Sequence, residues 1–117
     1  MKTVLLCVPL KKGCLSQYES FAKEHVKRDK EYKDMLDRYD IHCTKVWHKN
    51  INNRDYIFGY HEVGPHFRER MTGWETSDHP FDRWFRESMM AVYDIENAAG
   101  MEEPRLIFEV YTASLSA

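Results

Sequence analysis

The sequence predicts an α+β domain in which a four-stranded antiparallel sheet carries two main helices on one face. Three observations lead to this prediction. Four short segments are rich in β-branched and aromatic residues, and their apolar positions lack helical spacing. Two longer segments place apolar residues at helical spacing. The segments follow the order β-α-β-β-α-β, and 117 residues amount to a single domain, residues 1–117.

The first strand and the first helix follow each other directly. Residues 3–10 are apolar and β-branched, which is typical of a strand. A long helix is predicted from about Leu15 to about Arg38. Ser16 is a suitable N-cap for it, and Glu19, three residues further on, would complete a capping box.

The apolar stripe of this first helix has a polar gap in its middle. Its apolar members are Tyr18, Phe21, Ala22, Tyr32, Met35, Leu36 and Tyr39. Three positions that should face the same way hold His25, Arg28 and Asp29 instead. This conflict between pattern and polarity makes the gap the first place to look for a function.

The second and third strands are predicted to form an antiparallel hairpin. The second covers Ile41–Asn50 and the third covers Tyr56–Val63, where side chains alternate in character. Between them lies Asn52–Asp55, a cluster of residues that favour turns. Because this spacer is short, the two strands should pair with each other.

The second half of the chain starts with helical turns. Gly64 and Pro65 open a short helical turn that ends near Gly73. The second main helix is predicted from residues 77–98, with Ser77 or Asp78 as its cap, Pro80 in its first turn and Gly100 as its stop. Its apolar stripe consists of Phe81, Trp84, Phe85, Met89, Val92 and Ile95, with Ser88 among them.

The last strand is predicted for Arg105–Tyr111, where Leu106, Phe108 and Val110 alternate with the residues between them. Residues 112–117 are expected to fray. The complete order is the split βαβ of the ferredoxin-like fold. The helices cover one face of such a sheet, and a second copy that covered the other face would give a homodimer of the dimeric α+β barrel type.

Composition excludes several classes of partner. The chain has 19 acidic and 17 basic residues, so no basic surplus exists to bind nucleic acid or an anionic membrane surface. The longest apolar run, residues 3–10, is far shorter than the ~20 residues that cross a bilayer. The 3 cysteines show no C-x-x-C or zinc-type spacing, which indicates reduced thiols and a cytoplasmic protein.

One segment carries a resemblance to a known family. Residues 77–82 read Ser-Asp-His-Pro-Phe-Asp. The same Ser/Thr-x-His-Pro-apolar-Asp stretch begins the second helix of an uncharacterised bacterial family of unknown function, and the similarity runs over nearly the whole chain. The chain thereby resembles the dimeric α+β barrel superfamily. The bare chemistry of a helix start also accounts for a His, a Pro and an Asp at these positions.

The chain also resembles, more remotely, the L-rhamnose mutarotases, which interconvert the α and β anomers of a sugar. Their first helix carries an aromatic residue and a His one turn apart, and Phe21 and His25 have this relation here. The resemblance implies that His25 is the acid/base. Their second helix begins with Ser/Thr-Asp and then Arg-Trp-aromatic, which residues 77–78 and 83–85 match. The family's Tyr is Phe21 in this chain, and the spacing within the second pattern does not match closely.

The sharpest catalytic candidates are His25 and Asp29, which stand at i and i+4 on the predicted helix and could touch. A carboxylate there would orient the imidazole and raise its pKa, as in a general acid/base. Mutarotation needs one group to protonate the ring oxygen and another to take the anomeric proton. The alternative is a partly exposed pair on a helix that is charged throughout residues 23–33.

Candidates for substrate binding lie on the strands and on the second helix. Glu62 and Glu109 stand among apolar neighbours, and an inward carboxylate there would have a raised pKa. A position at the sheet rim is the alternative. Aromatic residues could stack on a ligand or simply belong to the core: Trp47, Tyr60, Trp74 and Trp84. Arg83 or Tyr60 would then hold substrate hydroxyls.

The sequence favours neither a metal nor a cofactor. His42, Cys43 and His48 share a strand, but Cys43 falls on the opposite face from the two histidines. No zinc-protease, nucleotide-binding or nucleophile-elbow pattern is present.

Three functions stay open on this evidence. The first is a homodimer with an aromatic pocket for a small molecule, acting as a mutarotase-like isomerase in which Asp29 orients His25. The second is a cofactor-free monooxygenase acting on an aromatic substrate, which requires an apolar pocket large enough for fused rings. The third is a ligand-binding or structural dimer without catalysis. The first requires His25 to face a pocket and not solvent.

Overall fold

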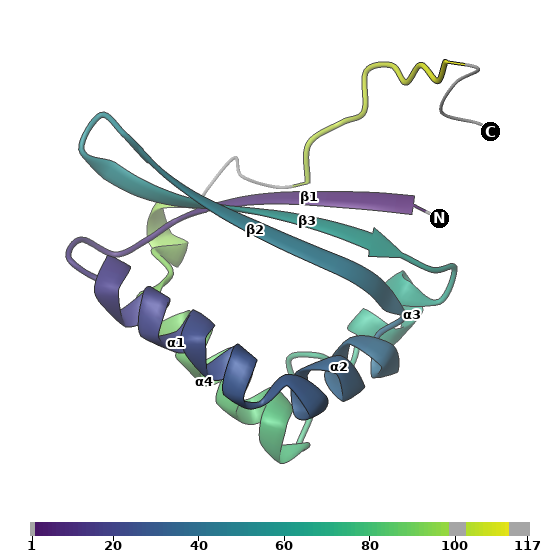
Figure 1. Ribbon diagram of the computed structural model, residues 1–117, viewed down its shortest axis with the longest axis horizontal. Helices are drawn as coiled ribbons and strands as arrows, with labels where there is room; N and C mark the ends of the chain where they lie inside the picture. The colour runs from purple at the N-terminus through teal and green to yellow at the C-terminus, as the bar shows by residue number, and fades with distance from the viewer. Residues whose placement is uncertain (1, 99–102, 113–117) are drawn as a thin grey trace.

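The computed structural model describes residues 2–98 and 103–112 and has two layers, a sheet and a set of helices against one of its faces (Figure 1). The sheet is antiparallel and three-stranded, with the strand order β1-β3-β2. Its strands are β1 (Lys2–Pro9), β2 (Ile41–Ile51) and β3 (Arg54–Val63). The helices are α1 (Leu15–Lys27), α2 (Asp29–Arg38), α3 (Phe67–Met71) and α4 (Pro80–Val92), followed by the 3₁₀ turn η1 (Ile95–Asn97). Among the described residues, no helix has the length and apolar character needed to cross a bilayer.

The predicted hairpin is confirmed. Strands β2 and β3 pair in antiparallel fashion, and the turn between them consists of Asn52 and Asn53. Both have positive φ angles, 52° and 64°. Two consecutive left-handed residues make the type I′ turn, whose twist matches that of the strands, and Asn tolerates this conformation better than most residues.

The two faces of the sheet differ in what they carry. The helix-facing side consists of Val4, Leu6, Val8, Thr44, Val46, Ile57, Gly59 and His61. The outer side consists of the alternating residues, which include Leu5, Cys7, Lys45, Trp47, Phe58, Tyr60 and Glu62. An irregularity in β2 between Ile41 and Cys43 shifts the register, so that Ile41 and Thr44 both face the helices.

The predicted fourth strand is absent from the described residues, so the prediction of a four-stranded ferredoxin-like sheet is wrong. The segment 103–112 has no strand and runs away from the body of the molecule (Figure 1). Alternating apolar residues show that a segment can form a strand, but a strand also needs an edge to pair with. Nothing in the alternation says where that edge is. The predictions for Gly100 and residues 113–117 fall outside the described part of the chain.

The single long helix predicted for residues 15–38 is also wrong, because the helix breaks at Arg28. This residue has φ −111° and ψ 34°, outside the helical region, and separates α1 from α2. Its guanidinium lies over the rings of Phe81 and Trp84, at 4.8 and 4.4 Å from their centroids. It also donates two hydrogen bonds to Glu31 at 3.0 and 2.9 Å. These contacts hold Arg28 at the junction of three helices.

The helix termini differ from the predicted caps. Helix α1 starts at Leu15 after Cys14, without a side-chain cap, so the predicted Ser16–Glu19 capping box is wrong. Helix α4 is capped by His79, whose Nδ1 accepts a hydrogen bond from the amide of Phe81 at 3.2 Å. The structure thus bears out helix-start chemistry at this stretch, with Pro80 in the first turn as predicted.

Helix α4 also ends earlier than predicted, at Val92 and not near Ala98. Tyr93 is extended and forms an isolated bridge with Leu10. The next amide, that of Asp94, donates to the carbonyl of Pro9 at 2.9 Å. These contacts hold residues 93 and 94 against the end of β1, and the helix therefore ends at Val92.

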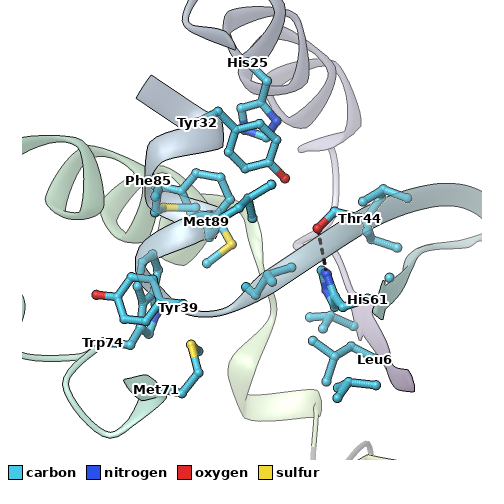
Figure 2. A pocket seen from close by; sticks show the side chains of 18 of the residues that line it. Leu6, His25, Tyr32, Tyr39, Thr44, His61, Met71, Trp74, Phe85 and Met89 are labelled. Carbon is cyan, nitrogen blue, oxygen red and sulfur yellow. Dashed lines mark hydrogen bonds between the residues drawn. The ribbon is translucent and has the colours of Figure 1, made fainter. Parts of the chain in front are cut away.

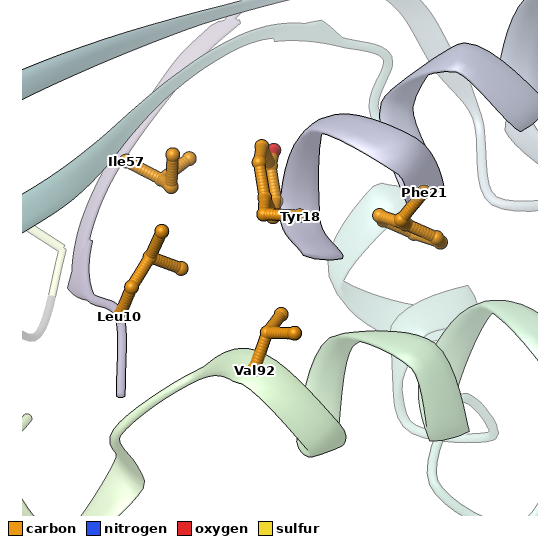
Figure 3. Packing of buried hydrophobic residues seen from close by; sticks show 5 residues of the cluster. All are labelled: Leu10, Tyr18, Phe21, Ile57 and Val92. Carbon is orange, nitrogen blue, oxygen red and sulfur yellow. The ribbon is translucent and has the colours of Figure 1, made fainter. Parts of the chain in front are cut away.

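Two apolar clusters anchor the helices. In one, α1 and α4 pack on the end of the sheet through Leu10, Tyr18, Phe21, Ile57 and Val92 (Figure 3). In the other, α2 packs on the start of α4 through Met35, Tyr39 and Phe81. The helix layer is thereby fixed at separate places, with space left between it and the middle of the sheet.

A fully buried carboxylate joins α2 to α4. Asp82 accepts two hydrogen bonds from the Arg38 guanidinium at 2.8 and 2.7 Å, and one each from Tyr39 and Ser77 at 2.7 Å. Burial by itself would raise the pKa of Asp82, but these hydrogen bonds and the charge of Arg38 outweigh it and lower the pKa to about 2. The carboxylate is therefore ionised at neutral pH.

Replacing Arg38 with Met tests this network. The variant leaves the buried Asp82 carboxylate without a cation, and we expect the free energy of unfolding to fall by about 3 kcal/mol. Urea denaturation at pH 7 measures it. The matched control is Lys33→Met, which removes the exposed Lys33–Asp29 ion pair (2.9 Å), and exposed pairs contribute ~1 kcal/mol or less. Equal losses in the two variants would contradict the importance of the buried carboxylate.

Candidate functional site

A cavity of about 440 Å³ lies between the helix-facing side of the sheet and helices α1, α2 and α4 (Figure 2). This volume falls in the range of about 300–1,000 Å³ that small-molecule sites occupy. Most of the wall is apolar or aromatic, and includes Leu6, Met35, Met71, Trp74, Phe85 and Met89. The cavity is thus a place where a ligand could leave water and contact apolar surface.

His25 projects from α1 into this cavity and is packed among aromatic rings. Its imidazole stacks on Phe85 (centroids 5.2 Å apart, planes at 14°) and on Tyr32 (4.5 Å, 29°), and it meets Phe21 edge-on at 4.5 Å. Burial lowers the pKa of His25 to about 4. The ring is therefore neutral at pH 7.

The Nε2 atom of His25 is buried and has no hydrogen-bond partner within the described part of the chain. A buried polar atom left without a partner costs roughly 1–3 kcal/mol, so native proteins keep few of them. A phenyl ring at position 25 would make the same stacking contacts without this cost. The unpartnered nitrogen therefore leaves a hydrogen-bonding position in the cavity that a water or a ligand can fill.

Polar side chains lie on the sheet side of the cavity, opposite Tyr32 of α2. Thr44 Oγ1 lies 3.0 Å from His61 Nδ1 and hydrogen-bonds to it (Figure 2). Burial raises the pKa of Tyr32 and lowers that of His61, so all three groups are uncharged at neutral pH. A Cβ at Gly59 would lie 3.3 Å from Nε2 of His61, so the glycine leaves room for this ring.

The end of the cavity near the start of α1 has a second pair of hydroxyls. The rings of Tyr18 and Tyr93 stack with their centroids 6.1 Å apart, and both residues line the cavity. Burial raises the pKa of both phenols, so they are protonated and neutral. The histidines and tyrosines on the inner wall thus offer hydrogen bonds without charge.

The predicted catalytic pair is not brought together. His25 faces the cavity, as the mutarotase hypothesis requires, but Asp29 lies beyond the helix break and pairs with Lys33 at 2.9 Å. The side chain of Asp29 is 58% exposed. The i, i+4 contact needs an unbroken helix, and α1 ends at Lys27. As a result, no carboxylate raises the pKa of His25.

The predicted substrate-binding residues lie elsewhere. Trp47, Tyr60 and Glu62 are on the outer face of the sheet, because they alternate with the residues that face the helices. Arg83 is exposed on α4. Trp84 packs between Phe21 and Phe81, with its ring centroid 5.3 Å from each of theirs.

Among the other residues singled out by sequence, Trp74 lines the cavity and meets Phe85 edge-on at 5.8 Å. Glu109 belongs to the exposed segment 103–112. Tyr32, Thr44 and His61 line the cavity but were not among the predicted site residues. His61 could have been predicted, because it alternates along β3 with Ile57 and Gly59 and so faces the same side of the sheet.

No protein-family model, curated protein or solved structure matches this chain. Within residues 2–98 and 103–112, no cluster of three or more His, Cys, Asp or Glu side chains is placed to hold a metal ion.

The lowered pKa of His25 predicts a pH-dependent stability. In the unfolded chain a His takes up a proton near pH 6.5, whereas His25 in the folded chain does so only near pH 4. Below pH 6.5 the unfolded state therefore binds more protons. We expect the free energy of unfolding to fall between pH 7 and pH 4, with His25 contributing on the order of 3 kcal/mol. His61 acts in the same direction.

The variant His25→Phe isolates this contribution, because it keeps the ring and removes the titrating group. Its unfolding free energy, measured by urea denaturation at several pH values, should depend less on pH than that of the wild type. His66→Gln, at an exposed position, is the control and should keep the wild-type slope. Identical slopes for the wild type and His25→Phe would show that His25 is not buried in neutral form.

Proposed function

We propose that this protein binds a small, uncharged and largely apolar molecule in the cavity between sheet and helices. The ligand class that fits best is a flat aromatic ring system with a hydroxyl group. That hydroxyl donates a hydrogen bond to Nε2 of His25. The observation that carries the proposal is the buried nitrogen of His25, which lacks a partner in an otherwise apolar wall.

The shape and chemistry of the wall support an aromatic ligand. Aromatic rings pack well against one another in stacked and edge-on arrangements. The rings of Tyr32, Trp74 and Phe85 all border the cavity, and a flat ligand could extend the stack that already contains His25. The sulfur-bearing side chains of Met71 and Met89 adapt readily to a ring edge.

The electrostatics support an uncharged ligand. His25, His61 and the inner tyrosines are neutral at pH 7, so they give a charged group no counter-ion. Glu103 also borders the cavity, but its carboxylate pairs with Arg68 at 3.0 Å. Moving an unpaired charge from water into such a site costs several kcal/mol.

A sugar fits this site less well. A monosaccharide carries a hydroxyl on most of its carbons, and each one that is buried needs a partner. The inner wall offers mainly aliphatic and aromatic surface, and Asp29 is too remote to assist His25. The geometry thus favours an aromatic ligand over the mutarotase hypothesis.

A second candidate function is cofactor-free monooxygenation of the same class of ligand. The apolar wall favours it, because such chemistry needs a flat substrate held away from water. His25 would then have to remove the hydroxyl proton, and its lowered pKa opposes that step. Binding without catalysis is therefore the better supported function. The three free cysteines accord with the cytoplasmic location that we propose.

A matched pair of probes, 2-naphthol and naphthalene, tests the proposal. They differ by one hydroxyl, and one added hydrogen bond to a buried acceptor should favour 2-naphthol by about tenfold in Kd. Titration calorimetry or quenching of protein fluorescence measures both constants. In His25→Phe we expect the two probes to bind with similar affinity.

Tyr60→Phe, which removes a hydroxyl from the outer face of the sheet, is the control and should keep the preference for 2-naphthol. A preference that survives in His25→Phe would overturn the role of this nitrogen. Absence of binding by both probes would overturn the proposed ligand class. NMR magnetisation exchange on reducing sugars, with wild type and His25→Ala, would then decide whether the mutarotase hypothesis holds.

A further inference from the structure

We infer that residues 105–111 form the segment through which two copies of this chain associate, each copy adding its segment as a strand along the free edge of β1 in the other. The proposal goes beyond ligand binding, and it needs two features on the same chain. One is an exposed segment with the residue pattern of a strand. The other is a strand edge along which further backbone hydrogen bonds can form.

The segment has the properties of an unpaired strand. Its five large apolar side chains are 71 to 78% exposed: Leu106, Ile107, Phe108, Val110 and Tyr111. Contiguous apolar surface of this kind usually marks an interaction site. In an extended strand, residues two apart lie on the same side, so Leu106, Phe108 and Val110 would form one apolar side of this segment. Figure 1 shows the segment leaving the body of the molecule.

The edge that fits it is β1. This strand pairs with β3 on one side. On its other side, the described residues bond to it only at its end, where the Pro9 carbonyl accepts from the amide of Asp94. Of its 8 residues, residues 2–8 have no described backbone partner on this edge, and they match the length of the seven-residue segment. Between Lys2 and Lys11 it carries no charged side chain. Only Pro9, at its end, would interrupt a ladder of backbone hydrogen bonds.

The opposite edge, β2, is protected in the ways that natural proteins use. It contains a register irregularity between Ile41 and Cys43, and it carries Lys45 and Lys49. Bulges and lysines at an edge both oppose the addition of a further strand. The contrast between the two edges assigns the segment to β1.

The partner that we infer is a second copy, because the chain itself supplies both the donor segment and the acceptor edge. No backbone hydrogen bond joins residues 103–111 to the β1 of their own chain. Exchange of an identical element between two copies is an inexpensive route to a dimer. Five side chains from each copy, at roughly 100–200 Å² each, would remove on the order of 1,000–2,000 Å² from water, comparable to the ~1,600 Å² of a stable interface.

The alternation of the segment sets its orientation. Leu106, Phe108 and Val110 form one wholly apolar side, and the other side contains Glu109. The apolar side fits the helix-facing side of β1, where Leu6 borders the cavity and is 42% exposed. Glu109 then falls on the outer side of the sheet, away from the helices. Each copy would thereby complete the cavity wall of the other.

The variant Phe108→Glu tests the interface. Phe108 is 78% exposed in the single chain, so a charge there leaves the fold intact, which circular dichroism checks. Sedimentation equilibrium should show a dimer for the wild type and a monomer for the variant, with the dissociation constant raised at least 100-fold. The matched control is Val26→Glu, because Val26 is 79% exposed on α1, and this variant should stay dimeric. A monomeric wild type, or a dimeric Phe108→Glu, overturns the proposal.

Isotope-filtered NMR on a mixture of labelled and unlabelled chains tests where the segment lies. We expect nuclear Overhauser contacts between Phe108 of one copy and β1 side chains of the other. A dimer without these contacts overturns the exchange and leaves a different interface. The outcome is independent of the proposed ligand, since the dimer can be confirmed whether or not 2-naphthol binds.

Discussion

The carboxylate of Asp82 is fully buried and can stay ionised only while Arg38, Tyr39 and Ser77 donate hydrogen bonds to it. Two of these donors stand at the end of α2 and one precedes α4, so the requirement fixes the two helices against each other. This junction has a consequence for the cavity. It sets the path of α2, and α2 carries Tyr32 to the ring of His25. The buried charge is thus a positional constraint as much as a source of stability.

The break at Arg28 makes this arrangement compatible with the sheet. His25 and Tyr32 are seven residues apart, which is about 10 Å along a straight helix. Their rings nevertheless lie 4.5 Å apart, because the chain bends between them and Arg28 is held over Phe81 and Trp84. The same bend separates Asp29 from His25. The helix break thus exchanges a His–carboxylate pair, which would favour a charged imidazole, for a ring stack that keeps it neutral.

Local patterns predicted the elements that depend on local chemistry. The three strands, the turn after Ile51 and helix α4 with Pro80 in its first turn could all be predicted, because alternation, turn residues and helix-start residues act within a few positions. The break at Arg28 could not, because no Gly or Pro marks it and the contacts that hold it come from distant residues of α4. Residues 105–111 show the same limit, since a strand pattern does not identify its partner.

In the candidate site, the wrong helix prediction led to a wrong prediction of the residue that contacts His25. His25 could be found because a polar residue interrupted an apolar stripe, and that signal survives the helix break. The prediction that Asp29 contacts His25 was wrong, because that contact needs an unbroken helix between the two residues. Thr44 was hidden by the irregularity in β2, which reverses the side on which residues after Cys43 fall. His61 was accessible in principle, as the polar member of an apolar set on β3.

The cavity and the β1 edge both contain polar groups without a hydrogen-bond partner among the described residues, but the two sites suit different kinds of partner. A strand edge needs a long, regular array of backbone groups, which only another polypeptide strand supplies. The nitrogen of His25 can take a single hydrogen-bonding partner within an apolar enclosure of about 440 Å³, which suits a small molecule. The two meet at Leu6, which belongs both to the edge strand and to the cavity wall. A strand added at this edge would therefore shield the cavity from water, and a drier cavity strengthens the hydrogen bond to His25.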